Sequence, residues 1–383
     1  MRYYIIAGEA SGDLHGSNLM KGLYALDSEA EIRFWGGSMM NAVAAENRPG
    51  QDALVKDYKE GAVMGITQVI LKAGTLLRNI RSCKEDILSW APDAVILIDY
   101  PGFNLKIAEF AHKKGFKVFW YIAPKVWASR EGRIRKIKKY VDKLFIVFPF
   151  EKKYFDSKGI SYVYAGNPLI DAIDGDKPSE REAFLSGNNL PDKPYIAMLA
   201  GSRKGEVSGM MPVFEEFARK LKAIDAYRDY QFIVAGAPSR SPEDYSKWTR
   251  SGLLKVVFGE TRDIVRHAQA AVVNSGTASL ETALIGTPQV VVYKTSSFNF
   301  AIAQLILKIE VISLGNLIAG HKVFKELIQD YCTADTVMNE VLRLTSDAQY
   351  RQKMLDGYAL IREKLGGSGA SEAVARTMIA ELS

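Results

Sequence analysis

The stretch Ala271-Ala-Val-Val-Asn-Ser-Gly-Thr-Ala-Ser-Leu-Glu281 passes from an apolar run through a polar turn into a helical pattern. This order predicts a buried strand that hands over to a helix. A helix N-terminus presents unpaired N–H groups and a positive dipole end, and Gly276 lets a phosphate approach the backbone. The hydroxyls of Ser275 and Thr277 add donors, and Glu281 can accept from ribose hydroxyls. The stretch therefore predicts half of a nucleotide-diphosphate site, with a plain capped turn as the alternative.

Size, charge and cysteine content limit the class of protein. The chain has 383 residues and a net charge of +6, which predict two or three domains and an anionic partner. Only Cys83 and Cys332 are present, so we expect neither a disulfide framework nor a cysteine-based metal site. The apolar-rich stretch 298–317 carries Lys308 and Glu310, which argues against a spanning helix. With too short an apolar N-terminus for a signal peptide, we expect a cytoplasmic protein.

The chain begins with a strand, a polar loop and a helix. Residues 3–7 read as a buried strand, and Gly8-Glu-Ala-Ser-Gly-Asp13 follows before apolar residues at helical spacing. This is the first unit of a doubly wound sheet. Glu9, Ser11 and Asp13 would lie at the carboxyl edge of that sheet, where ligands bind. The alternative is that Ser11 and Asp13 only cap the helix.

A carboxylate also follows the apolar run 94–98, which leads straight into Asp99-Tyr-Pro-Gly-Phe-Asn104. Asp99 at a strand end is well placed to act as a general base, in a loop held by Pro101 and Gly102. The alternative is that Asp99 caps the next helix. Other apolar runs of the first half that predict strands are 32–35, 117–122 and 144–147.

Three segments of the first half combine apolar and basic residues. A strand-end loop carries Lys125 and Trp127, which suit a sugar or a lipid phosphate. The basic run 130–139 keeps isoleucines at helical spacing and predicts an amphipathic helix, either solvated or facing an anionic membrane or phosphorylated lipid. The stretch 61–81, which includes Met64, predicts either a core helix or a hydrophobic acceptor pocket and membrane-facing patch.

The polar, turn-rich segment 174–191 predicts a domain boundary. Its Asp174-Gly-Asp176 spacing resembles a metal motif, but its position in a linker predicts a turn, and we expect no metal. The pattern then restarts with a strand at 195–199 and the loop Ala200-Gly-Ser-Arg-Lys-Gly-Glu206, in which Arg203 can bind a diphosphate through two N–H groups. Further strands are predicted at 232–235, 254–257 and 289–293.

Phe258 follows one of these strands and, with Arg262, can bracket a nucleotide base. Two doubly wound sheets predict a GT-B-like α/β architecture, in which two Rossmann-type domains face a cleft. We expect residues 1–175 to bind an acceptor at a membrane and residues 190–365 to bind a nucleotide-sugar donor. A last helix in 366–383 is expected to pack back on the N-terminal domain.

Eight motifs occur in this order along the chain: Ala7-Gly-Glu-Ala-Ser-Gly-Asp13, Ile122-Ala-Pro-Lys-Val-Trp127, Phe148-Pro-Phe-Glu151, Gly166-Asn-Pro-Leu169, Ala200-Gly-Ser-Arg203, Asn274-Ser-Gly-Thr-Ala-Ser-Leu-Glu281, Tyr293-Lys294 and Ser313-Leu-Gly-Asn-Leu-Ile-Ala-Gly320. Together they resemble the lipid-A-disaccharide synthase family over nearly the whole chain. The resemblance implies an inverting GT-B glycosyltransferase that joins UDP-2,3-diacylglucosamine to 2,3-diacylglucosamine 1-phosphate (lipid X). The product is a β-1,6 disaccharide 1-phosphate in lipid A and lipopolysaccharide biosynthesis, and UDP is released. The family works peripherally at the cytoplasmic face of the inner membrane in Gram-negative bacteria.

The resemblance also implies roles for individual residues. Asp99 matches the family's proposed base, and the residues themselves make Glu9 and Asp13 further candidates for this role. Gly102 stands where the family often has a second aspartate, which makes Asp99 the stronger base candidate. Donor-binding positions are matched by Arg203, Ser275, Gly276, Thr277, Glu281 and Asn316. Phe258 is a further donor-binding candidate because of its place at a strand end. The residues themselves suggest Ser11, Met64, Lys125 and Trp127 as acceptor or membrane contacts. No cofactor is implied.

Other functions remain open from the sequence. A UDP-sugar epimerase on the same fold would turn over its substrate without an acceptor. A non-catalytic UDP-sugar or lipid-binding protein would need no base. Nucleic-acid binding ranks last, because the basic residues form one helical face without a set of stacking aromatics. The expected partners are the two lipid substrates, an anionic membrane surface and a second copy of the chain in a homodimer.

Overall fold

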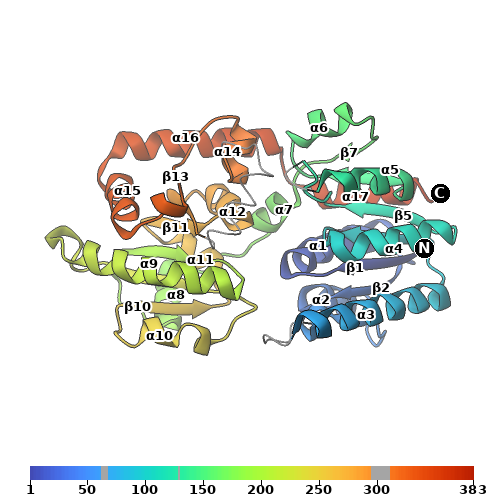
Figure 1. Cartoon of the computed structure of the whole chain (residues 1–383), viewed down its shortest axis with the longest axis horizontal. Helices are drawn as coiled ribbons and strands as arrows, with labels where there is room; N and C mark the ends of the chain where they lie inside the picture. Colours follow the sequence, from blue (N-terminus) through green and yellow to red (C-terminus); the bar gives the residue numbers. More distant parts are fainter. Residues whose placement is uncertain (62–67, 128–129, 295–310) are drawn as a thin grey trace. The chain divides into compact units, whose positions relative to one another are not determined.

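The computed structural model describes residues 1–61, 68–127, 130–294 and 311–383. The chain forms two compact units, here called unit 1 (Met1–Asp174 with Gly366–Ser383) and unit 2 (Gly175–Leu365) (Figure 1). Each unit contains one parallel sheet with helices on both faces. The predicted fold class of two doubly wound α/β domains is confirmed.

Unit 1 is built on a seven-stranded sheet in the order β3-β2-β1-β4-β5-β6-β7, and each strand is parallel to its neighbours. Its strands are β1 (Arg2–Ala7), β2 (Glu31–Gly36), β3 (Leu54–Asp57), β4 (Ala94–Ile98), β5 (Lys117–Tyr121), β6 (Lys143–Ile146) and β7 (Val163–Tyr164). Its helices are α1 (Ala10–Leu26), α2 (Ser38–Asn47), η1 (Tyr58–Gly61), α3 (Gln68–Trp90), α4 (Pro101–Lys113), η2 (Glu131–Arg133), α5 (Ile134–Tyr140), α6 (Glu151–Ser157), α7 (Pro168–Asp174) and α17 (Ala370–Ala380).

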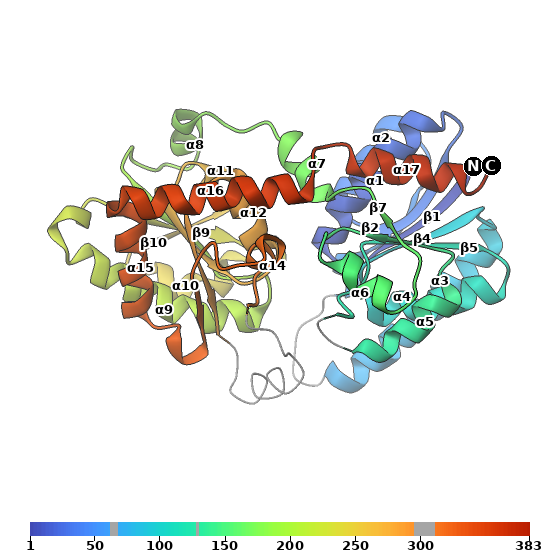
Figure 2. The ribbon, with the colours of Figure 1, turned by 90° about the horizontal axis from the view of Figure 1, so that it is seen from above.

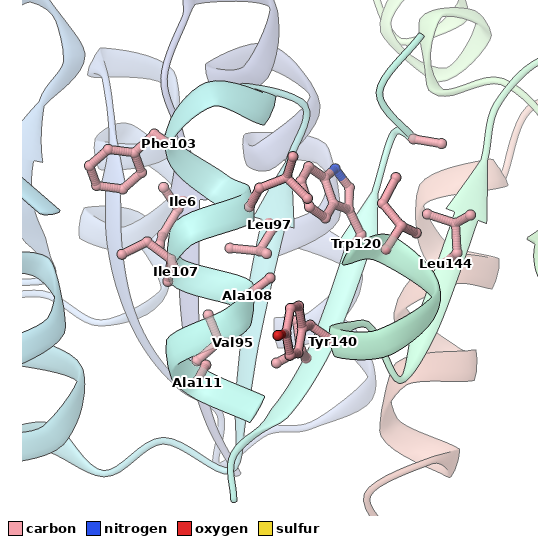
Figure 3. Close-up of a cluster of buried hydrophobic side chains, with 14 of the residues drawn as sticks. Ile6, Val95, Leu97, Phe103, Ile107, Ala108, Ala111, Trp120, Tyr140 and Leu144 are labelled. Carbon is pink, nitrogen blue, oxygen red and sulfur yellow. The ribbon is translucent and has the colours of Figure 1, made fainter. Parts of the chain in front are cut away.

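The central strands of unit 1 are buried on both faces. All five residues of β4 are buried, as expected of a parallel strand covered by helices on each side. Alternate side chains point to the layer formed by α3, α4 and α5. Figure 3 shows Ile107, Ala108 and Ala111 of α4 against Val95 and Leu97 of β4, all of them fully buried. The apolar run of β4 and the apolar residues spaced along α4 thus pack into the same hydrophobic core.

Helices α1, α2 and α17 cover the opposite face of this sheet (Figure 2). The last helix, α17, packs along α1 at Gly22, where a Cβ would lie only 3.2 Å from the Cα of Glu372. The Asp171 carboxylate accepts hydrogen bonds from the backbone N–H groups of Gly369 (2.6 Å) and Ser371 (2.7 Å). A charged acceptor therefore caps the start of α17 from another helix.

Unit 2 is built on a six-stranded parallel sheet in the order β10-β9-β8-β11-β12-β13. Its strands are β8 (Tyr195–Leu199), β9 (Gln231–Gly236), β10 (Leu254–Phe258), β11 (Ala270–Asn274), β12 (Gln289–Tyr293) and β13 (Glu326–Ile328). Its helices are α8 (Arg181–Gly187), α9 (Lys204–Lys222), η3 (Asp225–Tyr227), η4 (Pro242–Asp244), α10 (Ser246–Thr249), α11 (Thr261–Arg266), α12 (Thr277–Ile285), α14 (Leu314–Ala319), η5 (Gln329–Tyr331), α15 (Ala334–Ser346) and α16 (Ala348–Leu365).

The polar segment 174–191 contains more structure than a linker. Helix α8 lies within it, and Phe184 and Leu185 are buried in the core of unit 2. Two adjacent apolar residues are too few to show a helical period in the sequence. Asp176, in the predicted turn, forms an ion pair with Arg266 at 3.0 Å.

The long helices of the structure remain amphipathic. Helix α3 has 23 residues, α9 has 19 and α16 has 18. Each of them carries charged residues along its length. Across the described ranges, we find no helix with both the length and the apolar character needed to cross a bilayer.

We predict that Asp171→Ala lowers the free energy of unfolding of unit 1 by about 1–2 kcal/mol, because the first N–H groups of α17 lose their acceptor. Chemical denaturation followed by tryptophan fluorescence measures this, since only Trp248 lies in unit 2. The matched control is Glu372→Ala on the same helix, whose carboxylate pairs with exposed Arg376 at 2.8 Å. This control should cost less than about 0.5 kcal/mol, and equal losses in both variants would contradict the capping role.

Candidate active site

The order of strands reverses once in each sheet. In unit 1 the chain runs from β1 outward to β2 and β3 and then returns on the other side of β1 with β4. In unit 2 it runs from β8 to β9 and β10 and then returns with β11. Ligands of open α/β sheets bind outside the carboxyl ends of the strands at such a reversal. The loops after β1 and β4, and those after β8 and β11, therefore flank two candidate ligand sites.

Asp99 begins the loop after β4 in a left-handed conformation (φ 42°), and Tyr100 follows with φ 46°. Two successive non-glycine residues with this backbone cost about 1–3 kcal/mol each. The Asn104 amide holds the turn by donating to the Asp99 carbonyl at 2.8 Å. The Tyr100 ring covers Gly8, where a Cβ would lie 2.4 Å from the ring. The loop that carries Glu9 is thereby packed against the loop that carries Asp99.

Charges from three other segments surround Asp99. Burial raises the pKa of its carboxyl above the ordinary value, and the negative charge of Glu9 raises this pKa further. Lys125 and, more weakly, Arg133 lower it. The balance leaves a carboxyl that holds a proton more tightly than a solvated aspartate, which suits a general base.

Asp13 lies in a different environment from Asp99. Its side chain is almost fully buried and accepts hydrogen bonds from the backbone N–H groups of Gly37 (2.8 Å), Met39 (3.1 Å) and Met40 (3.1 Å). These donors form the start of α2, so Asp13 caps a neighbouring helix and not its own. Through these hydrogen bonds the Asp13 carboxylate on α1 holds the start of α2 in place.

The other predicted residues of unit 1 lie near the same edge of the sheet. Glu9 and Ser11 are exposed at the start of α1. Lys125 is exposed in the loop after β5, and the Trp127 indole donates to a buried glutamate of α6 at 3.0 Å. Met64 falls outside the described residues.

In unit 2, the loop after β8 turns at Gly201 (φ 98°). Glu206 accepts from the backbone N–H groups of Ser202 (2.9 Å) and Arg203 (3.1 Å) and so caps α9. The Arg203 side chain is 76% exposed and is therefore accessible to a ligand. A Cβ at Gly201 would lie 2.6 Å from Nδ2 of Asn274, so this loop is in contact with the end of β11.

The loop after β11 presents the N-terminus of α12. Ser275 donates its N–H to the Val292 carbonyl at 2.8 Å and so continues the sheet pairing. Gly276 and Thr277 are exposed, and a Cβ added at Gly276 would have no described atom within 4 Å. Gly276 has no side chain to cap the helix. The first N–H groups of α12 are thus arranged as in an anion site.

Two further donor-site candidates have partners within unit 2. Glu281 forms an ion pair with Arg262, with Oε1 and Nε 2.8 Å apart, and this pair orients the glutamate on α12. The half-buried Phe258 packs on Gly236 and edge-on against Tyr245, with ring centroids 5.7 Å apart. Phe258 ends β10, which is separated from β8 by β9.

Asn316 is fully buried at the middle of α14. Its amide donates to the Phe324 carbonyl (3.0 Å) and to Glu326 (2.8 Å), and its oxygen accepts from the Val323 N–H (2.8 Å). These contacts hold the segment that leads into β13. The Asn316 side chain therefore has no polar atom left for a ligand in this conformation. It can affect ligand binding only indirectly, by holding this segment in position.

The sequence did not point to three residues that shape the site of unit 1. Asn104 holds the Asp99 turn, Arg133 acts on the Asp99 charge, and Glu151 binds the Trp127 indole. Asn104 and Glu151 end the segments 99–104 and 148–151, and Arg133 lies within a basic run. Their roles depend on contacts between loops that follow different strands, which no local pattern reveals.

Two doubly wound domains, each with its ligand loops at a strand reversal, define the GT-B fold class. One structure with this fold is the UDP-GlcNAc 2-epimerase of Methanocaldococcus jannaschii in complex with UDP-GlcNAc and UDP, at a TM-score of 0.66 and 13% identity over 99% of this chain and 100% of that chain. Another is the calicheamicin glycosyltransferase CalG4, at a TM-score of 0.55 and 15% identity over 100% and 98% of the two chains. At these identities the likeness shows the fold alone.

Sequence relatives are more specific. The model of the lipid-A-disaccharide synthetase family matches residues 3–377. The lipid-A-disaccharide synthase of Geobacter metallireducens is 37% identical over 376 residues, which cover 98% of this chain and 95% of that protein. The chain therefore belongs to the lipid-A-disaccharide synthetase family, whose members are glycosyltransferases of lipid A biosynthesis. The predicted family is confirmed, and membership favours a transferase over the epimerase alternative.

We predict that Asp13→Asn lowers the free energy of unfolding by about 1–3 kcal/mol. An amide keeps one acceptor but turns an NH₂ group toward the N–H donors of α2. Denaturation followed by tryptophan fluorescence measures the loss. Glu9→Gln makes the same chemical change at an exposed neighbour and should alter stability by less than about 0.5 kcal/mol. An Asp13→Asn variant of unchanged stability that has lost activity would instead point to a role in chemistry.

Proposed function

We propose that this protein transfers the glucosaminyl group of UDP-2,3-diacylglucosamine to the 6-hydroxyl of lipid X. The products are the β-1,6-linked disaccharide 1-phosphate and UDP. Family membership supports a glycosyltransferase of lipid A biosynthesis. The observation that carries the proposal is Asp99, a carboxylate with a raised pKa that a left-handed turn holds at the strand reversal of unit 1.

In the proposed reaction, unit 1 binds the acceptor. The acceptor hydroxyl oxygen bonds to the anomeric carbon, the bond from that carbon to the diphosphate breaks, and Asp99 takes the hydroxyl proton. A general base of this kind contributes about 10²- to 10⁴-fold to the rate. Burial makes Asp99 a stronger proton acceptor, while Lys125 favours the ionised form that the reaction needs.

Unit 2 binds the UDP moiety in this proposal. Negative charge develops on the leaving diphosphate, and donors fixed in place before the reaction stabilise it most effectively. The N-terminus of α12 at Gly276 supplies such fixed donors, and the exposed Arg203 guanidinium adds a charged donor. Glu281, oriented by Arg262, accepts from the ribose hydroxyls. In this proposal Phe258 contacts the nucleotide base.

The first test measures UDP release from UDP-2,3-diacylglucosamine with and without lipid X. Release should require lipid X and should fall about 10²- to 10⁴-fold in Asp99→Asn, which removes the base but keeps the shape. Asp52→Asn, at an exposed position of the same unit, is the matched control and should retain full activity. Release without lipid X would indicate an epimerase or hydrolase. Transfer that survives in Asp99→Asn would move the base to Glu9.

We also infer that unit 1 binds an anionic bilayer through its basic helical face. Residues 78–158 contain 18 Lys and Arg and 9 Asp and Glu, while the whole chain has a net charge of only +6. Helices α3, α4 and α5 carry many of these cations on one face of the sheet (Figure 2). A hollow of about 380 Å³ on this face is lined by Lys84, Lys106, Glu109, Phe110, Lys113 and Lys114.

Each Lys or Arg near an anionic membrane surface contributes about 1 kcal/mol of binding. The triple variant Lys106→Ala, Arg135→Ala and Lys139→Ala should therefore bind vesicles of phosphatidylglycerol and phosphatidylethanolamine on the order of 100-fold more weakly in a sedimentation assay. The effect should shrink as salt is added. The control with the same net charge is Lys222→Ala, Lys247→Ala and Lys353→Ala in unit 2. Equal losses in both triple variants would mean that net charge alone matters and that no such face exists.

A further inference from the structure

A single buried carboxylate joins two loops at the carboxyl edge of the unit 1 sheet. Glu151, in the first turn of α6, is 0% exposed. It accepts hydrogen bonds from the Trp127 indole (3.0 Å) and from the backbone N–H groups of Val147 (3.1 Å) and Phe148 (3.0 Å). Trp127 lies in the loop after β5, and Val147 and Phe148 lie in the loop after β6. Glu151 therefore connects the ends of two neighbouring strands.

The contacts of Glu151 fit its ionised form. All three partners are N–H donors, so the carboxylate acts only as an acceptor. Burial raises the pKa of the Glu151 carboxyl to about 7, and the three N–H donors and the charge of Lys125 act in the opposite direction. The phenol of Tyr164 also faces this carboxyl, which contributes to the raised pKa of Tyr164 after burial. Removing the carboxylate would leave buried N–H groups without a partner.

Trp127 is fixed by packing as well as by this bond. Its ring lies edge-on against Phe150 with centroids 4.9 Å apart, and Phe150 stacks on Phe148 at 5.3 Å. At the other end of the loop, Ile122 takes a left-handed backbone (φ 63°), which is rare for a β-branched residue. Lys125 lies between these two fixed ends. The backbone N–H of Asp99 donates to the Tyr121 carbonyl at 3.3 Å, so the loop that carries Lys125 begins directly beside Asp99. The position of the Lys125 backbone thus depends on how well both ends of the loop are held.

We propose that Glu151 is a positioning residue for the transfer reaction, which holds the loop carrying Lys125 through the Trp127 indole and so keeps the Lys125 ammonium group beside Asp99. The inference rests on the proposed role of Asp99 as the base. The ammonium group stabilises ionised Asp99, the form that can accept the proton of the acceptor hydroxyl. When the loop is released, this stabilisation weakens. Asp99 then takes up its proton at a higher pH, and protonated Asp99 cannot act as the base.

The charged groups that face Asp99 make this effect measurable. Lys125 and Arg133 favour its ionised form and Glu9 opposes it, with Lys125 the stronger of the two cations. Of these groups, Lys125 alone lies between Ile122 and Trp127. Loss of a nearby cation raises the pKa of a carboxyl, so the acid limb of the kcat/KM profile should move to higher pH.

The test compares pH profiles of kcat/KM for the acceptor. Trp127→Phe keeps an aromatic ring against Phe150 but removes the N–H donor. This variant should move the acid limb of the kcat/KM profile to higher pH, by on the order of 0.5 pH unit. Lys125→Met should move it in the same direction. In the double variant the limb should stay where Lys125→Met alone puts it, because the loop no longer carries the charge. Trp90→Phe, at the opposite edge of the same sheet, is the matched control and should not move it.

Several results would overturn the inference. One is an acid limb that moves in Lys125→Met but not in Trp127→Phe, and another is a limb that moves in neither. Additive shifts in the double variant would also contradict it. Glu151→Gln turns one acceptor into a donor and should shift the limb as Trp127→Phe does, and Trp127→Phe remains the test if that variant fails to fold. Failure of the proposed function can be told apart from failure of this inference. If Asp99 is not the base, Asp99→Asn retains sugar transfer.

Discussion

Each strand of the two sheets is parallel to its neighbours, and this constraint places the polar chemistry at one edge of each sheet. Parallel strands need crossover connections that cover both faces with helices, so the central strands have no solvent-facing side. The loops at the carboxyl ends of the strands are then where polar side chains can meet a ligand. At the β1–β4 and β8–β11 reversals, neighbouring loops diverge to opposite faces and leave space for a ligand. Asp99 follows β4 beside the first of these reversals, and Arg203 follows β8 beside the second.

Asp99 combines opposing effects that a solvated aspartate lacks. Burial and Glu9 favour its protonated form, and Lys125 and Arg133 favour its ionised form. Glu9 follows β1, and Lys125 and Arg133 both follow β5, so the proton affinity of Asp99 depends on how these two connections are held. The left-handed residues Asp99, Tyr100 and Ile122 are unfavourable by themselves. Contacts such as the Tyr100 ring on Gly8 keep this geometry in place.

Hydrogen-bond donors distinguish structural carboxylates from the reactive candidate. Asp13 and Glu151 are both buried, and each accepts three N–H groups that belong to the fold. Asn316 is likewise committed to a neighbouring segment. Asp99 is only half-buried, accepts a backbone N–H from Tyr100, and is surrounded by charges from other segments. The role of a carboxylate near the ligand-binding edge of a sheet is therefore inferred from the hydrogen-bond donors around it. Its place in a sequence motif is not sufficient for this.

The sequence by itself determined the fold class and the family. Long apolar runs such as 94–98 and 289–293 end in small or polar residues, and this pattern identifies buried parallel strands. The edge strands β3, β7 and β13 have two to four residues and are mostly half-buried, so their pattern is too short to detect. Only the tertiary structure decided that Asp13 caps α2, that Glu281 pairs with Arg262 and that Glu151 holds Trp127. The same carboxylate can be a cap, an ion-pair partner or a base, because its role follows from burial and from neighbours that are distant in the sequence.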